Sequence, residues 1–118
     1  MTLHQSIIEV WFKFYRYKTG EEYIFDGKDG RHIKQLIAKI KVKVKEKGIE
    51  ETDDNIINSF RGFLASLTDP WILDNLEVSI INSKFNIIYA KAVRSSPFSK
   101  RIDDLIDREI SNSKRAAG

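Results

Sequence analysis

The sequence contains no cysteine, and that absence excludes several kinds of site at once. A disulfide scaffold, a thiolate zinc site and a cysteine nucleophile all require this side chain. The lack of cysteine also suits a reducing compartment, so we expect a cytoplasmic protein. No apolar run approaches the roughly 20 residues that a membrane helix needs. The first residues lack the basic and then apolar pattern of a signal peptide, so we expect no membrane contact.

Histidine is nearly as scarce, and the motifs of common catalytic sites are missing. His4 and His32 are the only histidines, and neither has a companion at metal-ligand spacing. Residues 27–29 depart from the Gly-Lys-Ser/Thr ending of a phosphate-binding loop. An EF-hand that began at Asp26 would place Ile37 where a bidentate glutamate is needed. The sequence therefore predicts a protein that is not an enzyme and that holds no metal and no cofactor.

Proline and glycine are few, with two and six residues respectively, which predicts short loops in a chain long enough for one hydrophobic core. Apolar residues recur at helical spacing along most of the chain. We therefore predict an all-α fold, a compact bundle of about five helices with short loops and one short extended link near residues 21–26. The predicted helices cover residues 3–18, 29–47, 53–67, 71–76 and 80–93, with a last one after Ser99.

This pattern also predicts how the chain is organised. Residues 1–94 form a helical module whose second helix is basic. Residues 95–112 form a C-terminal amphipathic helix packed on that module, and residues 113–118 form a disordered tail.

Positive charge is concentrated in one stretch. Residues 28–47 hold eight lysines and arginines against two acids, a net charge of +6 in a chain whose total is +3. On a helix, one arc of about 100° is apolar and faces the core; it contains Ile33, Leu36, Ile37, Ile40 and Val44. A rival interpretation is a strand, because residues 39–45 alternate between lysine and apolar residues. The helical pattern is longer and misplaces only Val42, and Gly48 supplies a helix end, so we predict a helix.

Lysines on one helix face predict contact with a phosphate backbone, because each contact releases counterions. Lysine outnumbers arginine here, which favours charge attraction over base reading, since arginine is the usual bidentate reader of bases. We therefore expect DNA or RNA to be bound through its backbone with little sequence choice. The candidate nucleic-acid-binding residues are Lys28, Arg31, Lys34, Lys39, Lys41 and Lys45. The alternative is a solvated lysine face that only maintains solubility.

A second hypothesis is a protein-interaction module without nucleic-acid binding. The first predicted helix has an apolar arc of about 220°, wider than one core face requires. Such an arc indicates either a central helix or one with a spare face for a partner. Trp71 is the aromatic residue that could be partly exposed, but a lid over the core is the favoured interpretation of this side chain. Phe12, Tyr15 and Trp71 are therefore candidate partner-binding residues, for self-association or for a replication protein.

Residues 11–93 resemble a small helical module of phage and mobile-element replication-related proteins. The stretches that carry the resemblance are Trp11-Phe12-Lys13-Phe14-Tyr15, Lys18-Thr19-Gly20, Tyr23, Gly27-Lys28-Asp29-Gly30 with Ile33-Lys34, and Ile80-Ile81-Asn82-Ser83-Lys84-Phe85-Asn86. The resemblance implies an accessory part in the DNA replication of such an element. It assigns no catalytic residue.

Overall fold

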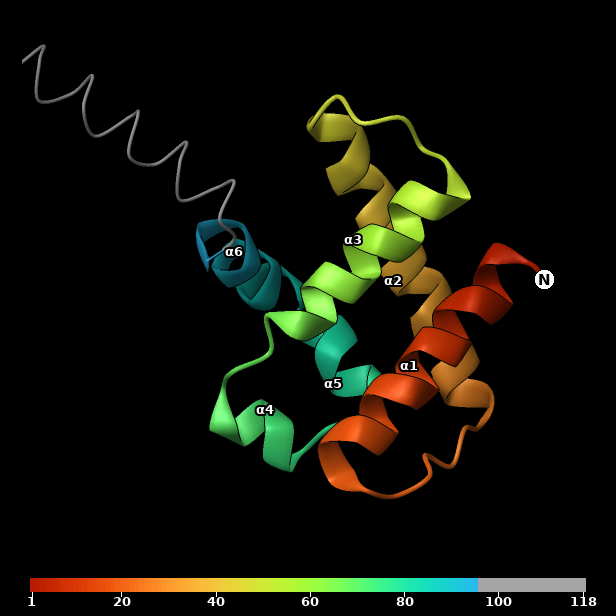
Figure 1. Cartoon of the computed structure of the whole chain (residues 1–118), viewed down its shortest axis with the longest axis vertical. Coiled ribbons are helices and arrows are strands. Elements are labelled where there is room, and N and C mark those ends of the chain that lie inside the picture. The colour runs from red at the N-terminus through yellow and green to blue at the C-terminus, as the bar shows by residue number, and fades with distance from the viewer. Residues whose placement is uncertain (96–118) are drawn as a thin grey trace, which may run out of the picture.

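The computed structural model describes residues 1–95, which fold into six α-helices and contain no strand (Figure 1). The helices are α1 (Leu3–Thr19), α2 (Gly27–Glu46), α3 (Asp53–Ala65), α4 (Pro70–Asp74), α5 (Val78–Ser83) and α6 (Phe85–Ser95). The prediction of a compact all-α bundle is confirmed. The helix expected after Ser99 and the tail at 113–118 lie outside the described residues.

The ends of the helices follow from local chemistry. Thr2 caps α1 and forms a reciprocal capping box with Gln5, and Asp69 caps α4 directly before a proline. Gly20 ends α1 with a φ of +76°, in the left-handed region that favours glycine. Gly48 does the same after α2 with a φ of +71°. These signals explain why predicted and observed boundaries agree for most helices.

The strand interpretation of residues 39–45 is wrong, because α2 is one continuous helix from Gly27 to Glu46. The apolar stripe predicted for this helix is buried, from Ile33 to Val44. Val42, the apolar residue that did not fit the stripe, is 54% exposed. Period-two alternation over seven residues is a weaker signal than helical spacing over twelve when a glycine stop follows.

The single helix predicted over residues 80–93 is also wrong. The structure has two helices, because α5 ends at Ser83 and α6 begins at Phe85. Lys84 lies between them with φ −97° and ψ 11°. Just before this break, Asn82 is buried against polar side chains of α2. Its partners are 43 to 50 residues away in the sequence, which is why local spacing did not reveal the break.

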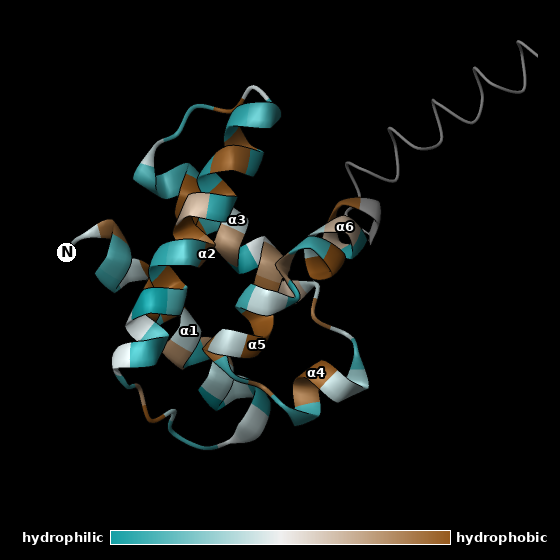
Figure 2. Cartoon of the chain, turned by 180° about the vertical axis from the view of Figure 1, so that it is seen from behind, coloured by the Kyte–Doolittle hydropathy of each residue, from teal (hydrophilic) through white to brown (hydrophobic). Residues whose placement is uncertain are grey.

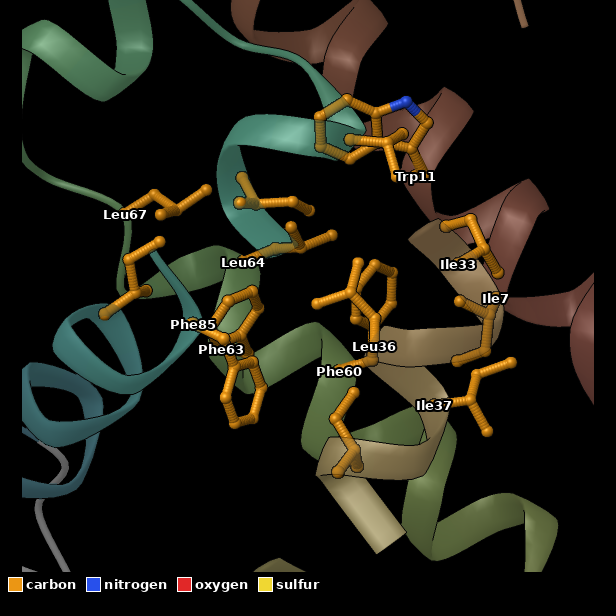
Figure 3. Packing of buried hydrophobic residues seen from close by; sticks show 14 of the residues in the cluster. Ile7, Trp11, Ile33, Leu36, Ile37, Phe60, Phe63, Leu64, Leu67 and Phe85 are labelled. Carbon is orange, nitrogen blue, oxygen red and sulfur yellow. The ribbon is translucent and has the colours of Figure 1, made fainter. Parts of the chain in front are cut away.

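Helices α1 and α3 run side by side, and both cross α2, which lies behind them in Figure 1. Helix α5 packs on α2, and α6 packs on α3 and α5. The core lies between these elements, where side chains from α1, α2, α3 and α6 converge (Figure 3). In the view from behind, hydrophilic and hydrophobic stretches interchange along α2 (Figure 2), as expected of a helix with one buried side.

The extended link at residues 21–26 is confirmed, and its two aromatic residues turn inward. The Tyr23 ring meets the Trp11 ring edge-on, with centroids 5.3 Å apart. Phe25 lies 5.8 Å from Phe12 by the same measure. Ile24, between them, is exposed. None of the helices described in residues 1–95 has the length and apolar character needed to span a membrane.

Candidate nucleic-acid interface

The outward side of α2 carries a row of cations. Because the opposite stripe of α2 is buried in the core, the helical rotation of 100° per residue turns this side to solvent. Arg31, Lys34, Lys41 and Lys45 share an arc of about 80° on it. Lys28 extends the row at the first turn, and all five side chains are exposed. We call these five residues the outward row.

The outward row extends along most of the length of α2. At 1.5 Å per residue, Lys28 and Lys45 are separated by about 25 Å along the helix axis. Arg31 and Lys34 form one close pair, Lys41 and Lys45 a second, and about 10 Å of axis lies between Lys34 and Lys41. Four of the five charges therefore lie on one side of a single rigid element, and Lys28 lies about 60° to the side of Arg31 at its first turn.

No side chain within residues 1–95 forms an ion pair or hydrogen bond with the charged groups of the outward row. The two carboxylates of α2 are engaged elsewhere. Asp29 is buried at 7% exposure, and Glu46 pairs with Lys43 at 3.4 Å. The positive potential of this surface is thus not neutralised by its own helix.

Lys39 differs from the other predicted phosphate-binding residues. Its Nζ donates to both the backbone oxygen and the Oδ1 of Asn82, each at 2.8 Å. Lys43 and Lys47 follow on the same side of α2, and their Nζ atoms lie 5.6 Å and 5.0 Å from the centroid of the Tyr89 ring. The structure thus separates the basic helix into an outward row and an inner row that faces α5 and α6. We omit Lys39 from the candidate interface.

Asn82 is the side chain that sequence reasoning missed. It is 3% exposed, and its Nδ2 lies 2.6 Å from Gln35 Oε1 and 2.8 Å from His32 Nδ1. An ammonium group can only donate, so Lys39 fixes Oδ1 as the acceptor and turns Nδ2 towards the other two partners. His32 Nδ1 therefore accepts this hydrogen bond. The sequence did contain one sign that Asn82 is buried. It lies three residues before Phe85, so helical spacing places it on the same side as an apolar residue.

The N-terminus of α2 is held by a second polar group. The Tyr23 hydroxyl donates to Asp29 Oδ1 at 3.0 Å and accepts from the Val78 N–H at 3.4 Å. The Asp29 Oδ2 accepts from the Asp26 N–H at 3.1 Å, which completes a capping box. Burial raises the pKa of Tyr23 well above its usual value, and the neighbouring Asp29 carboxylate adds to this rise. These contacts fix the end of α2 from which Lys28 and Arg31 project.

The predicted partner-binding residues fall into two groups. Phe12 and Tyr15 are half-buried under the link, where Tyr15 lies 4.9 Å from the Tyr23 ring by centroid. The wide apolar arc of α1 is thus covered in part by the chain itself. Trp71 is 53% exposed, so the favoured interpretation of a lid over the core is wrong, and Lys84 Nζ lies 5.9 Å from its ring centroid. The structure does not bring these three side chains together.

The cations of the second half of α1 are Lys13, Arg16 and Lys18, and each contacts a side chain of α1 or of the link after it. Lys13 pairs with Glu9 at 3.1 Å, and Arg16 pairs with Glu22 at 2.8 Å.

Within residues 1–95 no cluster of three or more acidic or histidine side chains is arranged to hold a metal ion. Comparisons of the chain with protein-family models, characterised proteins and solved structures gave no match. Geometry and charge are therefore the grounds for assigning a role to the outward row.

Proposed function

We propose that the outward row of α2 binds the phosphate backbone of nucleic acid without sequence specificity. The supporting observation is that five exposed cations lie along one helix, four of them within an arc of about 80°, with no partner among residues 1–95. A rigid line of charges lowers the entropic cost of binding a polyanion, because the helix holds their relative positions beforehand. Four of the five are lysines, which attract phosphate as point charges and leave the bases unread.

The same row sets the expected strength of the salt effect. For duplex DNA, the slope of log K against log salt concentration is roughly −0.9 for each phosphate neutralised. Five contacts would give a slope of about −4.5, and single strands about −3.5. A shallower slope would mean that only part of the row is used.

The test is fluorescence anisotropy with labelled single- and double-stranded oligonucleotides over a salt series. We expect K34E/K41E/K45E to bind much more weakly and to lose roughly three units of salt slope. The matched control is K13E/K84E/K91E, which changes the net charge equally at exposed lysines outside α2. Unchanged affinity in the α2 variant, or an equal loss in both variants, would contradict the proposal.

The resemblance of residues 11–93 to a module of phage and mobile-element replication proteins supports a specific setting. In that setting the protein is an accessory domain in the replication of such an element. The outward row would hold DNA near a replication protein that supplies catalysis. Replication genes next to the gene for this chain would support this setting, and a neighbourhood of unrelated genes would count against it.

A second candidate function is binding to a protein partner through Trp71. Exposed tryptophan is enriched among the residues that dominate protein interfaces, and Trp71 is 53% exposed. For self-association, we expect light scattering to show a dimer that W71A converts to a monomer. The other tryptophan, Trp11, is fully buried in the core and is not part of this surface. A monomer at all concentrations would remove self-association.

A further inference from the structure

A groove of about 590 Å³ lies between α1 and α3, and nothing proposed above uses it. These two helices lie in front of α2 in Figure 1, so the groove is separate from the outward row. Its volume is within the usual range of ligand-binding sites. The apolar residues that line it are Val10, Phe14, Ile57, Leu64 and Ala65.

The edge of this groove is cationic. Lys13, Lys18 and Arg61 line it together with a single acid, Glu9, which pairs with Lys13. Lys18 Nζ lies 5.7 Å from the ring centroid of Tyr17, a side chain that is 83% exposed. Arg61 has no ion-pair or hydrogen-bond partner among residues 1–95. An apolar floor between two helices with a positive edge fits an amphipathic segment that is apolar on one side and acidic on the other.

The chain itself contains a segment of this chemistry outside the described residues. In the sequence, residues 102–110 read Ile-Asp-Asp-Leu-Ile-Asp-Arg-Glu-Ile, with four acids and one arginine. Their apolar residues recur at spacings of three and four, as on one face of a helix. Both the apolar pattern and the sign of the charge complement the groove.

We propose that residues 102–110 of this chain occupy the groove between α1 and α3. The apolar residues of the segment would contact the groove floor, and its carboxylates would meet Lys13, Lys18 and Arg61. This would neutralise the positive edge of the groove and leave the outward row of α2 as the free basic surface. The inference does not depend on nucleic-acid binding by that row.

The connection is long enough for the segment to come from the same chain. Ala92 and Val93 of α6 line a small hollow with Ser59 and Gly62 of α3, so the end of α6 lies beside α3. The groove is on the side of α3 that carries Ile57 and Arg61. A helix with its side chains is about 10–12 Å across, and the six residues 96–101 can span up to about 20 Å. A short tether also gives the segment a high effective concentration at the groove.

The absence of cysteine allows a clean test on the full chain. Ser111→Cys introduces a unique thiol for a nitroxide spin label next to the segment, and the resonances of the ¹⁵N-labelled chain report which amides it approaches. We expect loss of intensity at groove positions such as Val10, Lys13 and Arg61, and none at Lys41 and Lys45 of α2. Adding L105D/I106D to the labelled chain should restore the groove signals, because an acidic side chain cannot replace the apolar contacts.

Three results would overturn the proposal. The label could leave the groove amides unchanged, or L105D/I106D could leave the pattern unchanged. The third is an undiminished intensity loss when spin-labelled ¹⁴N chain in excess is mixed with unlabelled ¹⁵N chain, which would assign the segment to a second copy. Groove resonances that ignore the label but shift with single-stranded DNA would identify the groove as a nucleic-acid site instead. L105D/I106D lies outside the described core, so its effect on the groove is separable from unfolding.

Discussion

The Tyr23 hydroxyl joins three segments of the chain: the link at 21–26, the first turn of α2 and the first turn of α5. It donates to Asp29 and accepts from the Val78 N–H. Tyr23→Phe would leave a buried Asp29 carboxylate oxygen and a backbone N–H without this partner. We expect a loss of about 1–3 kcal/mol in the free energy of unfolding, measured by urea denaturation. Tyr17→Phe is the control, since that side chain is 83% exposed, and should change stability by less than about 0.5 kcal/mol.

The raised pKa of Tyr23 gives this residue a signature at alkaline pH. Above pH of about 10 the unfolded chain releases the phenol proton while the folded chain keeps it. The stability that Tyr23 contributes is therefore complete below that pH and is lost as pH rises further. Wild-type stability should fall more steeply than that of Tyr23→Phe, by a part of the ~1.4 kcal/mol per pH unit that one proton carries. Parallel pH profiles for the two proteins would show that the hydroxyl is not protected by folding.

The buried hydrogen bonds between Asn82 and α2 can be tested by substitution. Asn82→Ala removes the acceptor for Lys39 Nζ on the side chain and the donor to Gln35 and His32. We expect a loss of about 2 kcal/mol in unfolding free energy, since buried polar partners are left unpaired. Asn86→Ala, on an exposed position of α6, should cost little. Equal effects of the two changes would mean that the Asn82 contacts are replaced by water at no cost.

Asn82 also shows where sequence reasoning stops at the residue scale. Helical spacing puts Lys39 on a flank of α2, about 80° from Arg31, and the structure agrees. Spacing could not tell which flank a second helix covers, because the partner residue is 43 positions away. The local pattern around Trp71 likewise did not decide between exposure and a lid over the core, whereas the structure leaves this ring 53% exposed.

At the scale of helices, caps and glycine stops explain why most helix boundaries could be predicted from the sequence. Side-chain caps at Thr2, Thr52 and Asp69 and left-handed glycines at positions 20 and 48 act over a few residues, so the sequence displays them directly. The break at Lys84 has no such signal. Tertiary contacts of α5 with α2 decide it, and the apolar spacing of residues 80–93 fits one helix or two equally well.

Two glycines should respond to alanine with opposite signs. Gly48 has a φ of +71°, and the Ile49 N–H beyond it donates to Val44 O at 3.0 Å. Gly48→Ala places a side chain in a left-handed conformation and should cost about 1 kcal/mol. Gly62 lies within α3, and an added Cβ there meets no atom within 4 Å. Gly62→Ala should therefore raise stability by about 0.5–1 kcal/mol. Thermal unfolding of the two variants measures both changes in stability. If both variants gained or both lost stability, the explanation from backbone conformation would be contradicted.

At the scale of the whole molecule, the sequence predicted an excess of positive charge on α2 but not which of its cations the neighbouring helices engage. The inner row turns towards α5 and α6, where Lys39 bonds to Asn82 and Lys47 lies over Tyr89. The outward row remains unpaired within residues 1–95. The division depends on how α5 and α6 pack against α2, and no local pattern in the sequence contains that information.

An unpaired row of like charges should also weaken the fold that carries it. Arg31 and Lys34, and Lys41 and Lys45, are spaced three and four residues apart, where like charges each cost about 0.2–0.5 kcal/mol. K34Q/K41Q/K45Q should therefore raise stability at low salt by roughly 0.5–1 kcal/mol. The gain should shrink as salt rises, because exposed charges are screened beyond a Debye length of about 10 Å at 0.1 M. Urea unfolding at two salt concentrations measures both effects.

The control for this last prediction is K13Q/K84Q/K91Q, which removes the same number of charges elsewhere. Lys13 pairs with Glu9, and Lys84 lies against Trp71, so these changes remove attractive contacts and should not raise stability. If both variants gained equally, net charge rather than the arrangement on α2 would be the cause. A gain confined to α2 would show that its outward row costs folding energy, as expected of a surface kept for a polyanionic partner rather than for the stability of the bundle.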